Sequence, residues 1–253
     1  MSIAQKLQDI LDCKDAIKTA IAGKGGTITD ATPLDEYATA VQSIPSGDDS
    51  VLKAIIDGSI TEIDIPSGVT KIKDALFLSC ASLTRVGLPN TVTELASQCF
   101  SRCNAMTSIT LPSSLLTIGA QAFFLSTRLA SVNIPSAVTS IGASAFQNCP
   151  ITAIDIPNSV TSIGGSAFLA NSVLVDAQIG TGITSIGSSV FGGSRNVIIR
   201  IYATTPPTLG TGFVPANYLG KIYVPDASVN DYKTASNWSA WASFIYPLSD
   251  YTP

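Results

Sequence analysis

The sequence predicts an α/β repeat fold: a solenoid with a parallel sheet on one face, flanked by an N-terminal helical hairpin and an aromatic C-terminal cap. The main observation is an anchor residue that recurs every 22 or 23 residues, at Pro66, Pro89, Pro112, Pro135, Pro157 and Gly180. A phenylalanine follows each anchor by eleven residues, at Phe77, Phe100, Phe123, Phe146, Phe168 and Phe191. The 253-residue chain is 45% hydrophobic and only 13% charged. A sequence pattern that recurs at a fixed period, together with enough hydrophobic residues to form a core, is typical of stacked repeats.

Each repeat begins with three apolar residues in the pattern L-x-x-L-x-L, as in Leu129, Val132 and Ile134. The alternation at the end of this pattern predicts a short strand with every second side chain inward. The proline then ends the strand, because it has no N–H to donate. We expect the following S-I-G-x-x-A-F segment to turn at its glycine and to place Ala and Phe inward on a short helical or 3₁₀ stretch.

The period of 22–23 residues lies within the window of roughly 20–29 residues of leucine-rich repeats. The pattern I-P-x-x-V-T-x-I-G-x-x-A-F-x-x-C-x-x-L, fullest at residues 134–149 and 154–168, resembles the BspA-type leucine-rich repeat. The resemblance implies a surface-exposed binding and adhesion scaffold of bacteria and protists, with no catalytic residues. We expect the array to span residues 51–200 and a capping region to span 201–253.

Residues 1–47 have a different pattern. Ile3, Ile10 and Ile17 recur every seven residues on one side of an expected amphipathic helix, and Pro33 opens a second helix. A helical hairpin of this size is too small to be stable alone. Its apolar stripe therefore packs on the repeats or drives self-association into a homo-oligomer, and the sequence leaves both options open.

Two stretches in this hairpin, residues 14–25 and 37–45, resemble the N-terminus of tailed-phage structural proteins. They match K-x-x-I-x-x-A-I-x-x-K-G and Y-A-x-x-V-x-x-I-P. The resemblance implies attachment to other tail or baseplate proteins through residues 1–47. The first residues also lack the basic and apolar regions of a secretory signal. We therefore expect a virion (phage tail) protein, assembled in the host cytoplasm, that binds a glycan or protein on the host surface. The alternative is an adhesin of the bacterial cell surface.

Six of the seven tyrosines and both tryptophans lie after residue 200. Large aromatic side chains can cover the open end of a solenoid, whose last strand would otherwise be an edge. The other interpretation is an aromatic platform for sugar rings, built by Trp238 and Trp241. The sequence favours the cap.

The composition argues against several functions. The chain contains no histidine, which removes Ser-His-Asp and Cys-His nucleophiles and most zinc chemistry. Its 14 Lys and Arg residues against 18 Asp and Glu disfavour nucleic-acid binding. The sequence has no apolar run long enough to span a membrane. We expect neither an enzyme nor a bound cofactor or metal.

The cysteines follow the repeat. Cys80, Cys103 and Cys149 stand fourteen residues after their anchors, in a column that contains Ser126, Asn171 and Ser194 in other repeats. The column suits a buried ladder of small side chains that bond the backbone of the turns.

Alternation along the predicted strands also leaves a row of polar side chains on the outer face of the sheet. Such groups, repeated at the strand spacing of about 4.8 Å, suit the hydroxyls of a sugar or a peptide. The alternative is a solvated face with no ligand. The candidate residues are Glu62, Asp64, Arg85, Thr110, Asn133, Asp155, Asp176 and Gln178.

Overall fold

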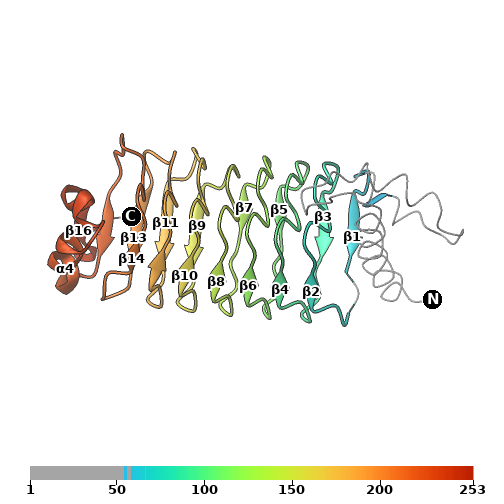
Figure 1. Ribbon diagram of the computed structural model, residues 1–253, viewed down its shortest axis with the longest axis horizontal. Helices are drawn as coiled ribbons and strands as arrows, with labels where there is room; N and C mark the ends of the chain where they lie inside the picture. Colours follow the sequence, from blue (N-terminus) through green and yellow to red (C-terminus); the bar gives the residue numbers. More distant parts are fainter. Residues whose placement is uncertain (1–53, 56–57, 66, 253) are drawn as a thin grey trace, which may run out of the picture.

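The computed structural model describes residues 54–55, 58–65 and 67–252. In this part the chain winds into an elongated coil in which each turn lies on the one before (Figure 1). Consecutive turns are joined by parallel strand pairs, so the predicted solenoid is confirmed. The predicted hairpin at residues 1–47, including Ile3, Ile10 and Ile17, lies outside the described residues.

One face of the solenoid is formed by the odd-numbered strands and β16, and we call it the odd-strand face. It contains a β1–β3 pair, a β5–β7 pair and a five-stranded sheet in the order β16–β15–β13–β11–β9, all parallel. The bounds are β1 Glu62–Asp64, β3 Arg85–Gly87, β5 Ser108–Ile109, β7 Ser131–Val132, β9 Ala153–Ile156, β11 Asp176–Ile179, β13 Ile198–Ile201, β15 Ile222–Val224 and β16 Ile245–Pro247.

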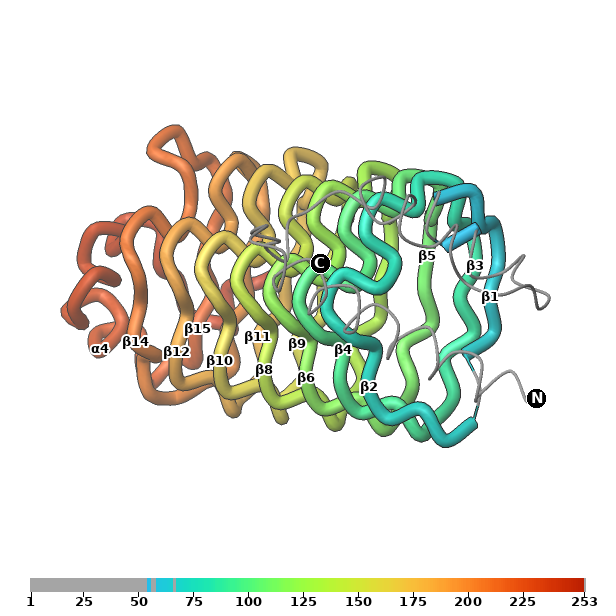
Figure 2. Tube along the Cα trace, turned by 45° about the vertical axis from the view of Figure 1, so that its right-hand side comes forward, coloured from blue at the N-terminus to red at the C-terminus, as the bar shows by residue number. Residues whose placement is uncertain are grey.

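A second face contains seven parallel strands in the order β14–β12–β10–β8–β6–β4–β2, which Figure 2 shows along one side of the coil. The prediction of a sheet on one face was therefore incomplete. Each of these strands has two residues, of which the second is a buried Ile or Leu, so there is no alternation to detect. The bounds are β2 Lys71–Ile72, β4 Glu94–Leu95, β6 Thr117–Ile118, β8 Ser140–Ile141, β10 Ser162–Ile163, β12 Ser185–Ile186 and β14 Thr208–Leu209.

The segment after each even-numbered strand is a series of tight turns, not the predicted helical or 3₁₀ stretch. In one such segment, Gln121 and Leu125 have left-handed φ values of +56° and +57°. The N–H groups of Gln121 and Phe123 donate to Ala143 and Ala145 of the next turn, both at 2.8 Å. In a helix these N–H groups would bond within the segment itself. The described residues from 58 to 225 contain no helix, so the repeats consist of short strands and turns.

The predicted phenylalanine column forms the centre of the core. All six rings are 0% exposed. The Phe146 ring lies 5.1 Å from that of Phe123 and 5.4 Å from that of Phe168, with planes within 8° and 6° of parallel. Phe213 continues the column edge-on, 5.4 Å from Phe191.

A glycine allows the turns to approach closely at one corner. A Cβ atom on Gly142 would lie 2.5 Å from the backbone nitrogen of Ala120 in the preceding turn. Any larger residue there would force the two turns apart, which explains the glycine of the S-I-G segment.

The C-terminal end is covered by short helices. They are η1 (Asp226–Ser228), α4 (Val229–Thr234), η2 (Ser239–Phe244) and η3 (Leu248–Asp250). The buried Trp238 donates its indole N–H to Pro207 O at 2.8 Å, and the buried Tyr232 donates its hydroxyl to Ala203 O at 2.9 Å. Strand pairing continues past residue 200, since β14 pairs with β12 and β15 with β13.

Candidate functional site

The outward side chains of the odd-strand face form columns that run across the turns. Strand register places Asp155 beside Gln178, Gln178 beside Arg200, and Arg200 beside Tyr223. The same column begins with Asp64 beside Gly87, and a neighbouring column begins with Glu62 beside Arg85. The outward side chains of this face therefore change along the solenoid axis. They are charged and paired near β1, small and polar in the middle, and aromatic near β16.

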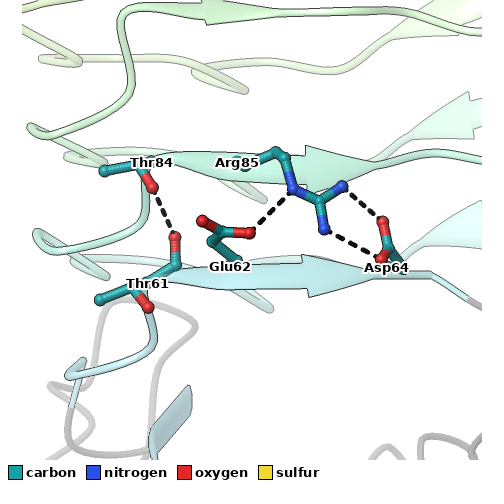
Figure 3. Close-up of polar contacts among 5 residues, drawn as sticks. All are labelled: Thr61, Glu62, Asp64, Thr84 and Arg85. Atoms are coloured by element: carbon teal, nitrogen blue, oxygen red, sulfur yellow. Dashed lines mark hydrogen bonds and ion pairs between the residues drawn. The ribbon is translucent and has the colours of Figure 1, made fainter.

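The ionic end is a triad of Glu62, Asp64 and Arg85 (Figure 3). The Arg85 guanidinium donates to Asp64 Oδ1 at 2.7 Å, to Asp64 Oδ2 at 2.9 Å, and to Glu62 Oε2 at 3.0 Å. The hydrogen bonds from Arg85 lower the pKa of the Asp64 carboxyl, and those to the two carboxylates raise the pKa of Arg85. Because Arg85 occupies both carboxylates, this end offers little unpaired charge to a ligand.

The middle of the face is hollowed. A cavity of about 460 Å³ lies over β5, β7, β9 and β11, where the outward side chains are short. We call it the trough. Its outward polar or small lining residues are Ser108, Thr110, Ser131, Asn133, Ala153, Asp155, Asp176 and Gln178.

A second hollow of about 310 Å³ adjoins the trough and shares Asp155 with it. It is lined by Asn158 and Tyr202, among others. The carboxylate of Asp155 therefore borders both the hydroxyl-lined trough and the hollow that contains Tyr202.

The far side of the trough is fixed by an ion pair. Arg200 Nη2 donates to Asp176 at 2.6 Å and 2.5 Å, and the Arg200 side chain is only 11% exposed. Burial opposes the charge of Arg200, but hydrogen bonding and the charge of Asp176 outweigh it and raise its pKa. The guanidinium also lies 4.6 Å from the centre of the Tyr251 ring. Beside it, Tyr202 donates its hydroxyl to Gln178 Oε1 at 3.2 Å.

The structure divides the eight predicted face residues into two groups. Five of them line the trough: Thr110, Asn133, Asp155, Asp176 and Gln178. The other three form the separate triad around Arg85. The sequence interpretation missed Arg200 and Tyr202. Arg200 stands 22 residues after Gln178, so continuing the column by one more period would have found it.

The alternative of an aromatic platform fails at Trp238, which is 0% exposed and packs against Phe213 and Tyr232. Trp241 is half-buried and packs against Phe244. A buried ring cannot stack on a ligand, so Trp238 is part of the cap and the two tryptophans do not form a platform together.

The cysteine column is buried and bonds the backbone, as predicted. The Sγ atoms of Cys103 and Cys149 lie 3.2 Å from Phe77 O and 3.1 Å from Phe123 O, and the Ser126 hydroxyl donates to Phe100 O at 3.0 Å. Burial raises the pKa of the Cys149 thiol to about 12.

The described residues contain no cluster of three or more His, Cys, Asp or Glu side chains placed to hold a metal ion. Within the same part of the chain, no helix has the length and apolar character needed to cross a membrane.

The repeat matches a known protein family. The family described as BspA type leucine-rich repeat region matches in six copies, over residues 54–172 and 96–205. A leucine-rich-repeat protein of T. pallidum is 27% identical, with a TM-score of 0.59, covering 69% of this chain and 83% of that one. A leucine-rich cell surface protein of Faecalibacterium prausnitzii is 21% identical, with a TM-score of 0.45, covering 64% of this chain and 60% of that one. No curated protein matches.

Proposed function

The chain belongs to the BspA-type leucine-rich-repeat family, and from this premise we propose that it is a non-enzymatic binding protein whose trough holds a ligand on a cell surface. The observation that carries the proposal is the hollow of about 460 Å³ on the odd-strand face. Concave sites with a few convergent polar groups are where proteins most often bind small ligands.

The surroundings of the trough suit a binding site. Its floor is a stack of hydrogen-bonded turns, and the Asp176–Arg200 pair fixes one side. A preformed site loses little conformational entropy on binding, which favours affinity. The absence of histidine from the sequence supports binding without catalysis.

For the location of the protein, we favour an adhesin displayed on a bacterial cell. The BspA-type family implies surface exposure and adhesion, and the trough is a surface that such a protein would present. In this proposal the solenoid is the part that contacts the target.

A substitution that fills the trough tests the proposed function without knowledge of the ligand. Ala153 lines the trough and is exposed, so Ala153→Trp adds a large side chain without removing a hydrogen-bonding group. Ala143→Trp is the matched control, at an exposed alanine outside the trough. Labelled full-length protein is applied to cultured epithelial cells and to bacterial cells. We expect Ala153→Trp to abolish binding and Ala143→Trp to retain it; equal binding by both variants, or no binding by the parent, would count against the proposal.

A second candidate is a tail component of a bacteriophage. The observation that favours it is the resemblance of residues 14–25 and 37–45 to phage structural proteins. These stretches lie outside the described residues. In this candidate, residues 1–47 attach the protein to the particle and the solenoid binds the host.

Fractionation separates the two locations. For an adhesin, the protein is labelled when intact cells are treated with a membrane-impermeant biotin reagent. For a tail component, it sediments with phage particles, and deleting residues 1–47 leaves the repeats folded but prevents incorporation. Protein found only on intact cells would exclude the phage candidate, and protein found only in particles would exclude the adhesin.

A further inference from the structure

The charges around the trough leave one carboxylate unpaired. Asp176 is paired with Arg200, so Asp155 is the one carboxylate of the lining that has no ion pair in the described part of the chain. No lysine or arginine is among the lining residues. An anionic ligand would be repelled by Asp155 and would find no cation among the lining residues, and a polycation would find a single unpaired carboxylate. The trough therefore fits a ligand without net charge.

The hydrogen-bonding groups of the trough both donate and accept. Ser108, Thr110 and Ser131 present hydroxyls, and Asn133 presents an amide. At Gln178, Oε1 accepts from Tyr202, which leaves the Nε2 donor for a ligand. A sugar hydroxyl also both donates and accepts, so a chain of sugars complements this lining along its whole length.

An aromatic ring stands beside the polar groups. Tyr202 is half-buried and lines the second hollow together with Asp155. A tyrosine ring offers an apolar face and a polar edge. The apolar face suits the C–H face of a pyranose ring, while Asp155 accepts hydrogen bonds from the hydroxyls at its edge.

A protein ligand fits the same surface less well. Protein interfaces depend on large apolar or aromatic anchors in desolvated pockets. The exposed large hydrophobic residues of the described chain are Leu116, Val173, Val175 and Leu219, and none of them lines the trough. A peptide added as a strand needs a sheet edge, whereas β11 is already paired with β9 and β13.

We infer that the trough binds a neutral oligosaccharide, which lies along the solenoid axis with one sugar ring against Tyr202. This inference rests on the proposed function and names its ligand class. Two residues test it: Asp155, which lines both hollows, would accept hydrogen bonds from the sugar, and Gln178, which lines the trough, would donate one.

The first experiment applies the full-length protein to a printed array of purified neutral, sialylated and sulfated glycans. We expect binding to neutral glycans of several sugars that is unchanged between low and high salt, because no ion pair is screened. Binding restricted to charged glycans would overturn the inference.

Variants then test the residues. Replacing Asp155 with Ala or Gln178 with Ala should weaken binding of the best neutral glycan about tenfold, the loss of about one good hydrogen bond. Asp155→Asn keeps an acceptor and should stay within about threefold of the parent. Ser162→Ala, on β10 of the opposite face, is the matched control and should bind as the parent does. An Asp155→Asn variant that binds no better than Asp155→Ala would contradict the role of Asp155 as a simple hydrogen-bond acceptor for an uncharged sugar.

A last measurement separates this inference from the proposed function. Target cells that bind the parent are treated either with periodate, which oxidises vicinal diols of sugars, or with a protease. Loss of binding after periodate supports the inference. Binding that resists periodate but is lost after protease, and is still blocked by Ala153→Trp, overturns the sugar ligand while leaving the proposed function intact. Failure of the parent to bind any cell counts against the proposed function itself.

Discussion

The Oδ1 atom of Asn171 accepts a hydrogen bond from the backbone N–H of Cys149 at 2.8 Å, across two adjacent turns. The Nδ2 atom of the same side chain donates to Phe146 O at 3.1 Å. In the neighbouring turn the equivalent backbone groups bond each other, since Ser126 N–H donates to Phe123 O at 3.1 Å. The Asn171 amide is thus inserted into a backbone hydrogen bond of the core.

Asn171 satisfies two buried groups, and its removal should therefore cost more than removal of a single hydroxyl. We expect Asn171→Ala to lower the free energy of unfolding by about 2–4 kcal/mol, since each unsatisfied buried group costs about 1–3 kcal/mol. Ser126→Ala is the control: Phe100 O loses the hydroxyl but keeps the N–H of Cys103 at 3.4 Å. Its cost should be about 1 kcal/mol. Urea unfolding measures both, and equal midpoints for the two variants would contradict the inserted amide.

The Phe146 ring lies between two parallel rings in the middle of the array. We expect Phe146→Ala to cost about 3–5 kcal/mol, the usual range for truncation of a buried phenylalanine. The ring-sized cavity should also weaken both neighbouring turns, because each repeat is stabilised mainly by its neighbours. Phe146→Leu, which leaves a smaller cavity, should lose less. A urea midpoint for Phe146→Ala equal to that of the parent would contradict the role of the column.

The core could be predicted from the sequence because inward positions repeat with a fixed period and tolerate few residue types. Six phenylalanines in register are enough to define the stack. The second sheet was missed because a strand such as Thr117–Ile118 has one inward residue and shows no alternation. The turns were taken for helix because their left-handed residues, such as Gln121 and Leu125, are not glycines.

The candidate site was only partly predictable. Alternation places Asn133 and Asp155 on the outer face, but the trough exists because the side chains between them are short, as at Ala153. Whether a residue is paired also depends on contacts that periodicity does not show. Arg85 and Arg200 illustrate this, since each binds a carboxylate of an adjacent strand.

The buried thiols and phenols predict how stability depends on pH. Burial raises the pKa of Cys99, Cys103, Cys149, Tyr218 and Tyr232 above their ordinary values of 9.0 and 10.0. In the unfolded chain these groups lose protons near those ordinary values, while in the folded chain they stay neutral. Stability is therefore fully present below about pH 9 and is lost as the pH rises.

Between pH 8 and pH 10 we expect the free energy of unfolding to fall by about 4 kcal/mol from the three thiols, because each contributes about 1.4 kcal/mol over this interval around its ordinary pKa of 9.0. Cys99 stands where Ala122 and Ala145 stand in other repeats, so Cys99→Ala should fold well and reduce the fall by about 1.4 kcal/mol. Urea unfolding at each pH measures both. After denaturation without reductant, all five cysteines should react with a thiol reagent. A fall that is identical in the parent and Cys99→Ala would contradict the raised pKa of this thiol.

The two arginines of the odd-strand face should contribute differently to stability, although each pairs with aspartate. The Arg85 side chain is 53% exposed and its partners Glu62 and Asp64 are 58% and 70% exposed. Water can replace Arg85 at these carboxylates, so Arg85→Ala should leave the urea midpoint unchanged.

Arg200 is 11% exposed, and its loss removes the partner of Asp176 and uncovers one face of Tyr251. We expect Arg200→Ala to cost about 2 kcal/mol, because a half-buried carboxylate is left unpaired and a cation–π contact is lost. Asp176→Asn in the Arg200→Ala background should recover part of that cost, since the amide needs no cation. The same double change at Asp64 and Arg85 should have no effect on the midpoint. If Arg200→Ala and Arg85→Ala shift the urea midpoint equally, burial does not determine the strength of these ion pairs. The claim that the Asp176–Arg200 pair holds one side of the trough in place would then be wrong.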